Sequence, residues 1–111
     1  MKKTLTKIAK SYVISVLTES KDINALTPQA FAESQGMSLR KMQRTLAAER
    51  ENYADIREAE RLAIARKMLK KMSVAEVSSA IGYKSTSSFI LAFKRWYGVT
   101  PGKIFKTVKQ K

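Results

Sequence analysis

Hydrophobic residues recur every three or four positions along most of the chain, the spacing that places them on one face of an α-helix. The first stretch predicts a helix that ends near Glu19, followed by a polar connection at residues 21–25. The longest stretch, residues 52–72, contains neither glycine nor proline and predicts one long helix. The apolar positions of these two helices are Leu5, Ile8, Tyr12, Val13 and Val16, and then Ile56, Ala59, Leu62, Ala65, Leu69 and Met72.

Short polar residues and glycines mark where the remaining helices begin and end. A Ser or Thr before a hydrophobic stretch caps the free backbone N–H groups of a helix, and a glycine after one adopts the left-handed conformation that ends it. The predicted caps are Thr27, Ser38, Ser73, Ser85 and Thr100, and the predicted helix-ending glycines are Gly36, Gly82 and Gly98. The pattern predicts an all-α fold of about seven helices, with a basic tail at residues 106–111 that we expect to fray.

The chain contains an internal duplication. In each copy a short capped helix meets a glycine and a tight turn, and a second helix follows. The two glycines, Gly36 and Gly82, are 46 positions apart, whereas the inward residues of the second helices are 47 apart, so the second turn is predicted to be one residue longer. Each copy has the helix-turn-helix pattern, in which the second helix lies in the major groove of DNA. We therefore expect three parts: a helix-turn-helix subdomain over residues 1–51, a linker helix over 52–72 and a second helix-turn-helix subdomain over 73–111.

Charge supports a nucleic-acid partner. The 111 residues carry 22 Lys and Arg against 9 Asp and Glu, a net charge of +13. The last acid is Glu76, and seven basic residues follow it. Such a field attracts phosphate polyanions, and contact with them releases condensed counterions.

Catalysis is not expected. The chain has no His and no Cys, which removes the commonest general base, the thiol nucleophiles and most zinc sites. The four glycines stand too far apart for a phosphate-binding loop. Neither a metal nor a cofactor is predicted, and the absence of cysteine fits a cytoplasmic protein.

The outward faces of the two second helices are the candidate DNA-binding surfaces. In the first, over about residues 38–50, Leu39, Met42 and Leu46 point inward, which leaves Arg40, Gln43, Arg44 and Ala47 outside. Arginine suits the guanine edge and glutamine the adenine edge, because their donors match two base atoms at once. The second, over about residues 85–97, is predicted to bury Phe89, Ala92, Phe93 and Trp96. Its outward residues, Lys84, Ser87, Ser88, Leu91 and Arg95, should specify sequence less sharply.

The predicted linker helix has the length that two such surfaces require. About 20 residues at 1.5 Å each span roughly 30 Å. Adjacent major-groove segments on one side of B-DNA are about 34 Å apart, and DNA bending can absorb the difference.

Three segments resemble the DNA-binding domain of the AraC/XylS family of bacterial transcription regulators. SVAEVSSAIGYKSTSSFILAFKRWYGVTPGKIFK, from Ser73 to Lys106, is similar to the family signature. SLRKMQRTL, from Ser38 to Leu46, resembles the first recognition helix, with Gln43 and Arg44 at the family's Gln-Arg pair. ERLAIARKML, from Glu60 to Leu69, resembles the linker helix, so the resemblance covers nearly the whole chain and implies a homeodomain-like arrangement.

The resemblance implies transcription control, usually activation, with promoter DNA and RNA polymerase as partners. It also implies a cytoplasmic location at the nucleoid. Members usually join this domain to a sensing and dimerising domain, so we expect the isolated domain to be a monomer, and a dimer to be possible through an N-terminal domain absent from this sequence. The residues expected to contact bases are Arg40, Gln43, Arg44, Thr86, Ser87, Ser88 and Leu91. Those expected to contact phosphates are Thr27, Lys41, Ser73, Lys84, Lys94 and Arg95.

Three residues depart from the family pattern. Leu91 stands where the family often has Arg, Arg50 where a Gly commonly precedes the linker helix, and Ser78 where a tightly packed Ala is usual. The exposed Leu91 favours a second hypothesis, a protein-interaction module that binds RNA polymerase or a related regulator as an anti-activator. A basic amphipathic protein of the membrane surface is a third, which the glycine turns and the aromatic positions disfavour.

Overall fold

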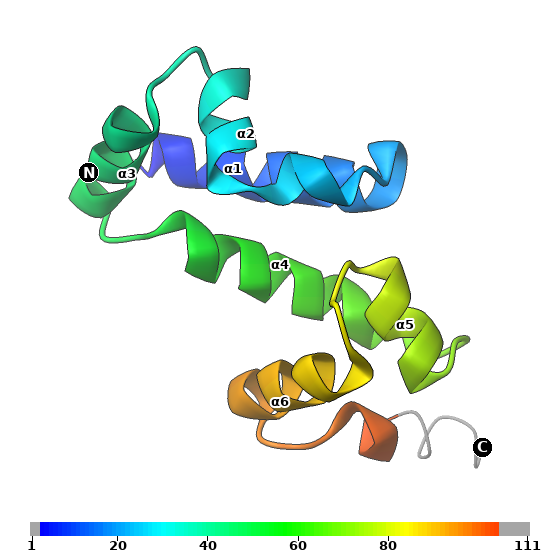
Figure 1. The fold of residues 1–111 in the computed structure, drawn as a ribbon. Coiled ribbons are helices and arrows are strands. Elements are labelled where there is room, and N and C mark those ends of the chain that lie inside the picture. Colours follow the sequence, from blue (N-terminus) through cyan, green and yellow to red (C-terminus); the bar gives the residue numbers. More distant parts are fainter. Residues whose placement is uncertain (1–2, 105–111) are drawn as a thin grey trace. The chain divides into compact units, whose positions relative to one another are not determined.

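The computed structural model describes residues 3–104, which divide into two compact units between Arg61 and Leu62. Figure 1 shows the described chain as helices joined by loops, and no strand occurs among these residues. The all-α prediction is confirmed. The basic tail predicted at residues 106–111 lies outside the described residues. Within residues 3–104, no helix is both long and apolar enough to cross a membrane.

The first unit holds three α-helices and the first part of a fourth. Its elements are α1 (Thr4–Ser15), a π-helical turn (Val16–Ser20), a 3₁₀ turn (Ile23–Leu26), α2 (Pro28–Ser34), α3 (Leu39–Ala48) and α4 (Tyr53–Met68), within which the boundary between the units falls. The predicted polar connection at 21–25 is wrong in part, because Ile23–Leu26 is helical. Asp22 accounts for this turn, since its carboxylate accepts a hydrogen bond from the Asn24 N–H at 3.1 Å.

The core of the first unit is built around Phe31. The Phe31 ring is fully buried, lies 5.1 Å from the Tyr12 ring and is stacked on the Tyr53 ring, also at 5.1 Å. The Tyr53 hydroxyl donates to the Leu26 carbonyl at 2.8 Å. Burial raises the pKa of this phenol to about 12, although the nearby charge of Arg57 acts in the opposite direction. The buried hydroxyl is therefore satisfied by a backbone acceptor rather than by water.

Ile8 was predicted to belong to the buried face of the first helix, and this prediction is wrong. Its side chain is 39% exposed, whereas Ala9 is fully buried. The buried positions of α1 are Leu5, Thr6, Ala9 and Val13. The stripe runs through Ala9 because i, i+4 and i+8 lie nearly above one another on a helix.

The second unit contains α5 (Val74–Ala80), α6 (Thr86–Tyr97) and a helical segment at residues 101–104. Phe89 and Phe93 are fully buried, with their ring centroids 5.7 Å apart. Trp96 was predicted to be buried with them, and this prediction is wrong, since it is 42% exposed. Periodicity gives the direction of a side chain but not what covers it. Trp96 lies in the last turn of α6, where Tyr97 instead packs against Phe93 at 4.7 Å.

Helix α4 is shorter than the predicted linker helix of residues 52–72. It begins one residue after Asn52, whose side chain accepts from the Asp55 N–H at 2.9 Å, and it ends at Met68. Leu69 is still fully buried, so the apolar stripe continues beyond the helix. The backbone leaves the helix because Ser73 must be extended, with φ −69° and ψ 165°, in order to cap α5.

Both glycine turns have the same geometry. In the first, the Gly36 N–H donates to the Glu33 carbonyl and the Met37 N–H to the Ala32 carbonyl, both at 3.0 Å. In the second, the equivalent donors are Gly82 to Ser79 and Tyr83 to Ser78. Each glycine has a positive φ, 66° for Gly36 and 85° for Gly82, which defines the Schellman motif. The second turn is one residue longer, since five residues separate α5 from α6 and four separate α2 from α3. The predicted duplication is confirmed.

Arg50 forms the same kind of turn after α3 without a glycine. Its N–H donates to the Ala47 carbonyl and the Glu51 N–H donates to the Leu46 carbonyl, both at 2.9 Å. Its φ is 63°, in the left-handed region that disfavours residues with a Cβ. The arginine noted as a departure from the family therefore occupies a backbone conformation suited to glycine.

Candidate nucleic-acid interface

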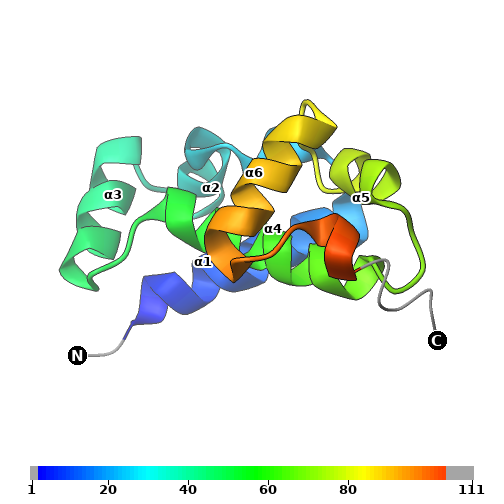
Figure 2. The same cartoon turned by 90° about the horizontal axis from the view of Figure 1, so that it is seen from below.

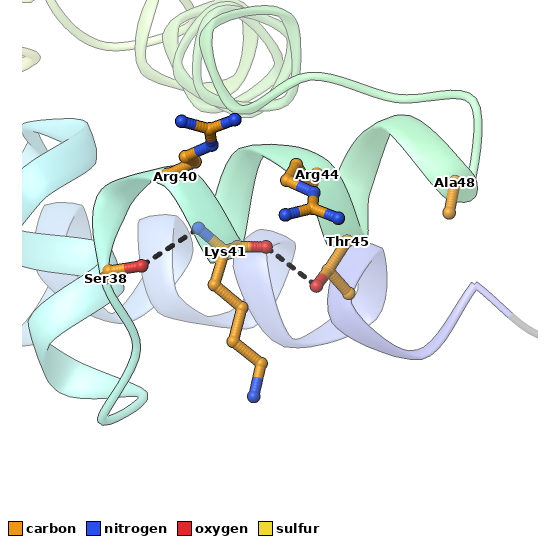
Figure 3. Close-up of a pocket in the computed structure, with 6 residues that line it drawn as sticks. All are labelled: Ser38, Arg40, Lys41, Arg44, Thr45 and Ala48. Carbon is orange, nitrogen blue, oxygen red and sulfur yellow. Dashed lines mark hydrogen bonds between the residues drawn. The ribbon is translucent and has the colours of Figure 1, made fainter.

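Helix α3 presents a shallow, strongly cationic hollow (Figure 3). The Ser38 hydroxyl caps α3 by accepting from the Lys41 N–H at 3.1 Å, and the Thr45 hydroxyl donates to the Lys41 carbonyl at 2.8 Å. The lining residues are Ser38, Arg40, Lys41, Arg44, Thr45 and Ala48. Three of these six carry a positive charge and none carries a negative one, so the hollow is suited to a polyanion.

The residues predicted to contact bases from the first recognition helix all lie on its exposed surface. Arg40, Gln43 and Arg44 are exposed, whereas Met42 and Leu46 are fully buried on the opposite side. The inward and outward faces of α3 were thus correctly predicted. Whether the outward side chains touch bases stays a prediction.

The hollow is not centred on the predicted face. Of the four outward residues predicted, only Arg40 and Arg44 line it, and Gln43 and Ala47 lie to one side. Thr45 and Ala48, which were not predicted, line the hollow together with Lys41. Thr45 lies four residues after Lys41 and Ala48 four residues after Arg44, and this helical spacing is the signal that could have found them.

The outer surface of α6 is less charged. Ser87, Leu91 and Arg95 recur at four-residue spacing and are exposed, and the Leu91 side chain is 69% exposed. Ser88 is exposed as well, but its hydroxyl accepts from the Ser85 hydroxyl at 2.9 Å, so it already has a partner. Thr86 is exposed at the start of the helix, about 140° around the axis from Leu91. Of the predicted base-contacting residues of α6, Ser87 and Leu91 therefore form a common face.

The residues predicted to contact phosphates differ in their exposure and in the hydrogen bonds that their polar groups make. Lys41, Lys84, Lys94 and Arg95 are exposed cations. The Thr27 hydroxyl accepts from the Ala30 N–H at 3.1 Å. Ser73 is half-buried in a capping box, in which its N–H donates to the Glu76 carboxylate at 2.9 Å. Because a carboxylate already lies at the start of α5, this position is less suited to a phosphate than the lysines are.

Ser78 braces the second helix-turn-helix. It is 2% exposed, and its hydroxyl donates to the Ser85 carbonyl at 3.2 Å across the turn. The hydroxyl that replaces the usual alanine methyl thus adds a second hydrogen bond to the Ser85 carbonyl, which also accepts from the Phe89 N–H at 3.3 Å. Figure 2 shows α5, this turn and α6 in succession.

Glu49 fixes the C-terminal end of α3 to the start of α1, a contact that the sequence did not reveal. Its carboxylate accepts from the Leu5 N–H at 3.0 Å, the Thr6 N–H at 2.8 Å and the Thr6 hydroxyl at 2.6 Å. Burial acts to raise the pKa of this carboxyl, but the hydrogen bonds from Thr6 and Leu5, together with the charge of Lys3, outweigh it. The pKa is consequently lowered from its usual 4.5.

The chain contains two copies of the helix-turn-helix motif, each with a cationic or hydroxyl-rich outer helix. These motifs place the chain in the class of helix-turn-helix proteins. The chain matches a family described as the helix-turn-helix domain over residues 31–107. The chain belongs to this family, the AraC type of helix-turn-helix proteins, whose members are transcription regulators rather than enzymes.

Bacterial regulators are similar to the chain in sequence and in structure. The HTH-type transcriptional regulator RipA of Corynebacterium glutamicum is 31% identical over 94 residues, which are 83% of this chain and 28% of that protein. The transcriptional regulator CdpR of Pseudomonas aeruginosa is 30% identical, with a TM-score of 0.69 over 72% of this chain and 26% of that one.

A DNA-binding transcriptional dual regulator of Escherichia coli K-12 shares the fold, with a TM-score of 0.79, 24% identity and coverage of 93% and 94%. The chain spans less than a third of the length of the curated relatives that it matches.

Proposed function

We propose that the chain binds promoter DNA in a sequence-specific manner, with α3 and α6 as its two recognition helices, and that it regulates transcription as an activator. The cationic hollow along α3, where Arg40, Lys41 and Arg44 surround a surface without an acid, is the observation that carries the DNA-binding part. Activation, contact with RNA polymerase and a place at the nucleoid are supported by the resemblance to AraC/XylS regulators.

Helix α3 carries most of the sequence discrimination in this proposal. Arg40 and Arg44 project from an exposed surface and have the forked donors that pair with guanine. Helix α6 offers hydroxyls and the apolar Leu91, which can distinguish only a thymine methyl. The exposed cations Lys84, Lys94 and Arg95 contact phosphates and contribute affinity without specificity.

The two recognition helices would occupy adjacent segments of the major groove. Helix α4 has 16 residues and is therefore about 24 Å long. This is shorter than the spacing of about 34 Å between groove segments, and the connecting segments, together with bending of the DNA, would supply the difference. The division of the chain at residues 1–51, 52–72 and 73–111 is part of this proposal.

Selection of oligonucleotides from a random duplex pool tests the proposal. We expect a motif to be enriched, with one half better defined than the other. On the selected duplex, Arg40→Ala and Arg44→Ala should each weaken binding by about 1–3 kcal/mol and relax specificity in one half-site. Lys94→Ala is the matched control, because loss of a phosphate contact weakens binding to all sequences alike and lowers the salt dependence. Unchanged affinity of both arginine variants would show that α3 does not read the bases.

A protein-interaction module is the second candidate, and the 69% exposed Leu91 is the observation that favours it. An apolar side chain at the centre of the outer face of α6 suits a protein partner such as RNA polymerase or a related regulator. Under this hypothesis the selection enriches no motif, and Leu91→Ser abolishes binding to the partner while leaving weak, salt-sensitive DNA binding intact.

A further inference from the structure

A second hollow lies wholly within the second unit and includes none of the proposed DNA-binding residues. Its volume is about 470 Å³, and it is lined by Ala63, Arg66, Lys67, Lys70, Tyr97 and Ile104. Ala63, Arg66 and Lys67 belong to α4, and Lys70 follows the end of that helix. One further residue belongs to the end of α6 and one to the helical segment at 101–104. A volume of this order lies within the roughly 300–1,000 Å³ typical of ligand-binding sites.

The hollow combines an apolar floor with a cationic rim. Ala63, Tyr97 and Ile104 supply apolar surface, and the aliphatic stems of the lysines extend it. The Arg66 guanidinium lies 4.8 Å from the centre of the Tyr97 ring, a cation–π contact that holds both side chains in place. Lys67 and Lys70 are exposed, and no acidic residue of the described chain lines the hollow. Its chemistry therefore complements a surface that is both apolar and negatively charged.

We propose that this hollow docks an acidic amphipathic segment of a partner protein, with one apolar side chain in the hollow and carboxylates facing Lys67 and Lys70. A helix that lays an apolar face into such a groove is a common mode of peptide recognition. Charge complementarity at the rim gives specificity and speeds association.

DNA is a less suitable occupant for two reasons. A sugar-phosphate backbone has little apolar surface to bury against a floor made of Ala63, Tyr97 and Ile104. In addition, at 100° per residue, Tyr97 lies about 120° around α6 from Leu91 and about 80° from Ser87, the two residues that form the outer face of that helix. If this outer face enters a major groove as proposed above, Tyr97 lies to its side and does not point toward the bases. This second argument rests on the proposed function, whereas the composition of the hollow does not.

Fluorescence anisotropy with the full chain and a labelled synthetic peptide tests the proposal. The probe is a 15-residue amphipathic peptide with glutamates on either side of a leucine and a tryptophan, and a second peptide replaces every glutamate with glutamine. We expect the acidic peptide to bind and the glutamine peptide to bind at least about tenfold more weakly. Lys67→Glu combined with Lys70→Glu should lower affinity for the acidic peptide by about tenfold or more. Ala63→Phe, which fills the floor without changing the charge, should lower it as well.

The matched control is Lys7→Glu combined with Lys10→Glu, which makes the same change of charge at exposed positions of the first unit, outside the hollow. It should change peptide affinity less than about threefold, because surface charges at a distance are screened by salt. Circular dichroism and the melting temperature of each variant verify folding. Equal loss in the two double variants would mean general charge attraction and would overturn the proposal.

Two further results would also overturn the proposal. One is the absence of peptide binding by the parent chain. The other is a loss of random-sequence DNA binding in the Lys67 and Lys70 variant with peptide binding unaffected, which would assign the hollow to phosphates. The peptide assay contains no DNA, so its outcome is independent of the proposed DNA-binding function. Peptide binding can be absent while the selected oligonucleotides bind, and peptide binding can be present while no oligonucleotide is selected.

Discussion

The hydrogen bonds of Glu49 give the sharpest prediction about stability. Helix α1 begins at Thr4, so the N–H groups of Leu5 and Thr6 belong to its first turn and have no partner within the helix. The preceding residue, Lys3, provides no side-chain cap. The Glu49 carboxylate, which is 8% exposed, satisfies both donors from 43 and 44 positions away in the sequence. It therefore serves as the N-terminal cap of α1.

Glu49→Ala should lower the free energy of unfolding of the first unit by about 2–4 kcal/mol. Each buried donor left without an acceptor costs about 1–3 kcal/mol, and three donors are affected. A hollow lined by Lys3, Ala48, Glu49 and Arg50 adjoins the carboxylate, so water can enter part of the space that the shorter side chain leaves. The total cost is therefore lower than the sum for three donors without an acceptor. Glu49→Gln retains an acceptor but loses the charge, and should cost about 1–2 kcal/mol, since charge-assisted hydrogen bonds are about twice as strong as neutral ones.

Urea denaturation followed by far-ultraviolet circular dichroism measures these changes. Trp96, the single tryptophan of the chain, belongs to the second unit, so its fluorescence follows that unit separately. Glu51→Gln is the matched control. Its ion pair with Lys3, at 3.0 Å, is largely exposed and should contribute less than about 1 kcal/mol. The argument fails if Glu49→Ala changes stability by less than about 0.5 kcal/mol or if Glu51→Gln costs as much.

The pH dependence provides an independent measurement at the same residue. The pKa of the Glu49 carboxyl is lowered in the folded chain, so the folded state favours the ionised form. The stabilisation is present above the usual pKa of 4.5 and is lost as the pH falls through the lower folded value. The difference in stability between the parent chain and Glu49→Gln should accordingly shrink below about pH 4.5. A difference that is constant from pH 7 to pH 3 would contradict this account.

Three further changes have defined outcomes. Arg50→Gly should raise the free energy of unfolding by about 0.5–1 kcal/mol, because relief of the positive φ outweighs the added backbone freedom; a loss of stability in urea denaturation would refute this. Tyr53→Phe should cost about 0.5–1.5 kcal/mol at neutral pH. It should also reduce the decline in stability expected of the parent as the pH rises from 10 toward 12, because the raised pKa of Tyr53 makes ionisation unfavourable to folding, and the raised pKa of Tyr12 leaves part of the decline in place. Ser78→Ala should cost about 1 kcal/mol and lower the melting transition seen by Trp96 fluorescence, and an unchanged transition would mean that the Ser85 carbonyl needs no such donor.

The sequence predicted the features that depend on local chemistry. Capping by Thr27, Ser38, Ser73 and Ser85 was predicted because a side-chain oxygen reaches an N–H two or three residues away. The turns at Gly36 and Gly82 were predicted because only glycine adopts a positive φ without strain. The outward face of α3 followed from the 3.6-residue period.

The features that were missed depend on contacts between distant segments. Trp96 has the helical phase of a buried residue, but nothing in the local pattern tells whether another element covers the last turn of α6. The role of Glu49 depends on α1 and α3 being folded together, and a glutamate at a helix end has no local signature of a buried cap. Thr45 and Ala48, by contrast, were missed although their helical spacing from Lys41 and Arg44 places them beside the hollow on α3.

The distance along the chain between α1 and its cap has a consequence for the order of folding. During synthesis the residues of α1 leave the ribosome before those of α3, and the acceptor for Leu5 and Thr6 is made more than 40 residues later. A 12-residue helix is marginal in water by itself. We expect nascent α1 to stay unstructured until α3 is complete, so that pulsed hydrogen exchange during refolding protects the amides of the two helices in one kinetic phase.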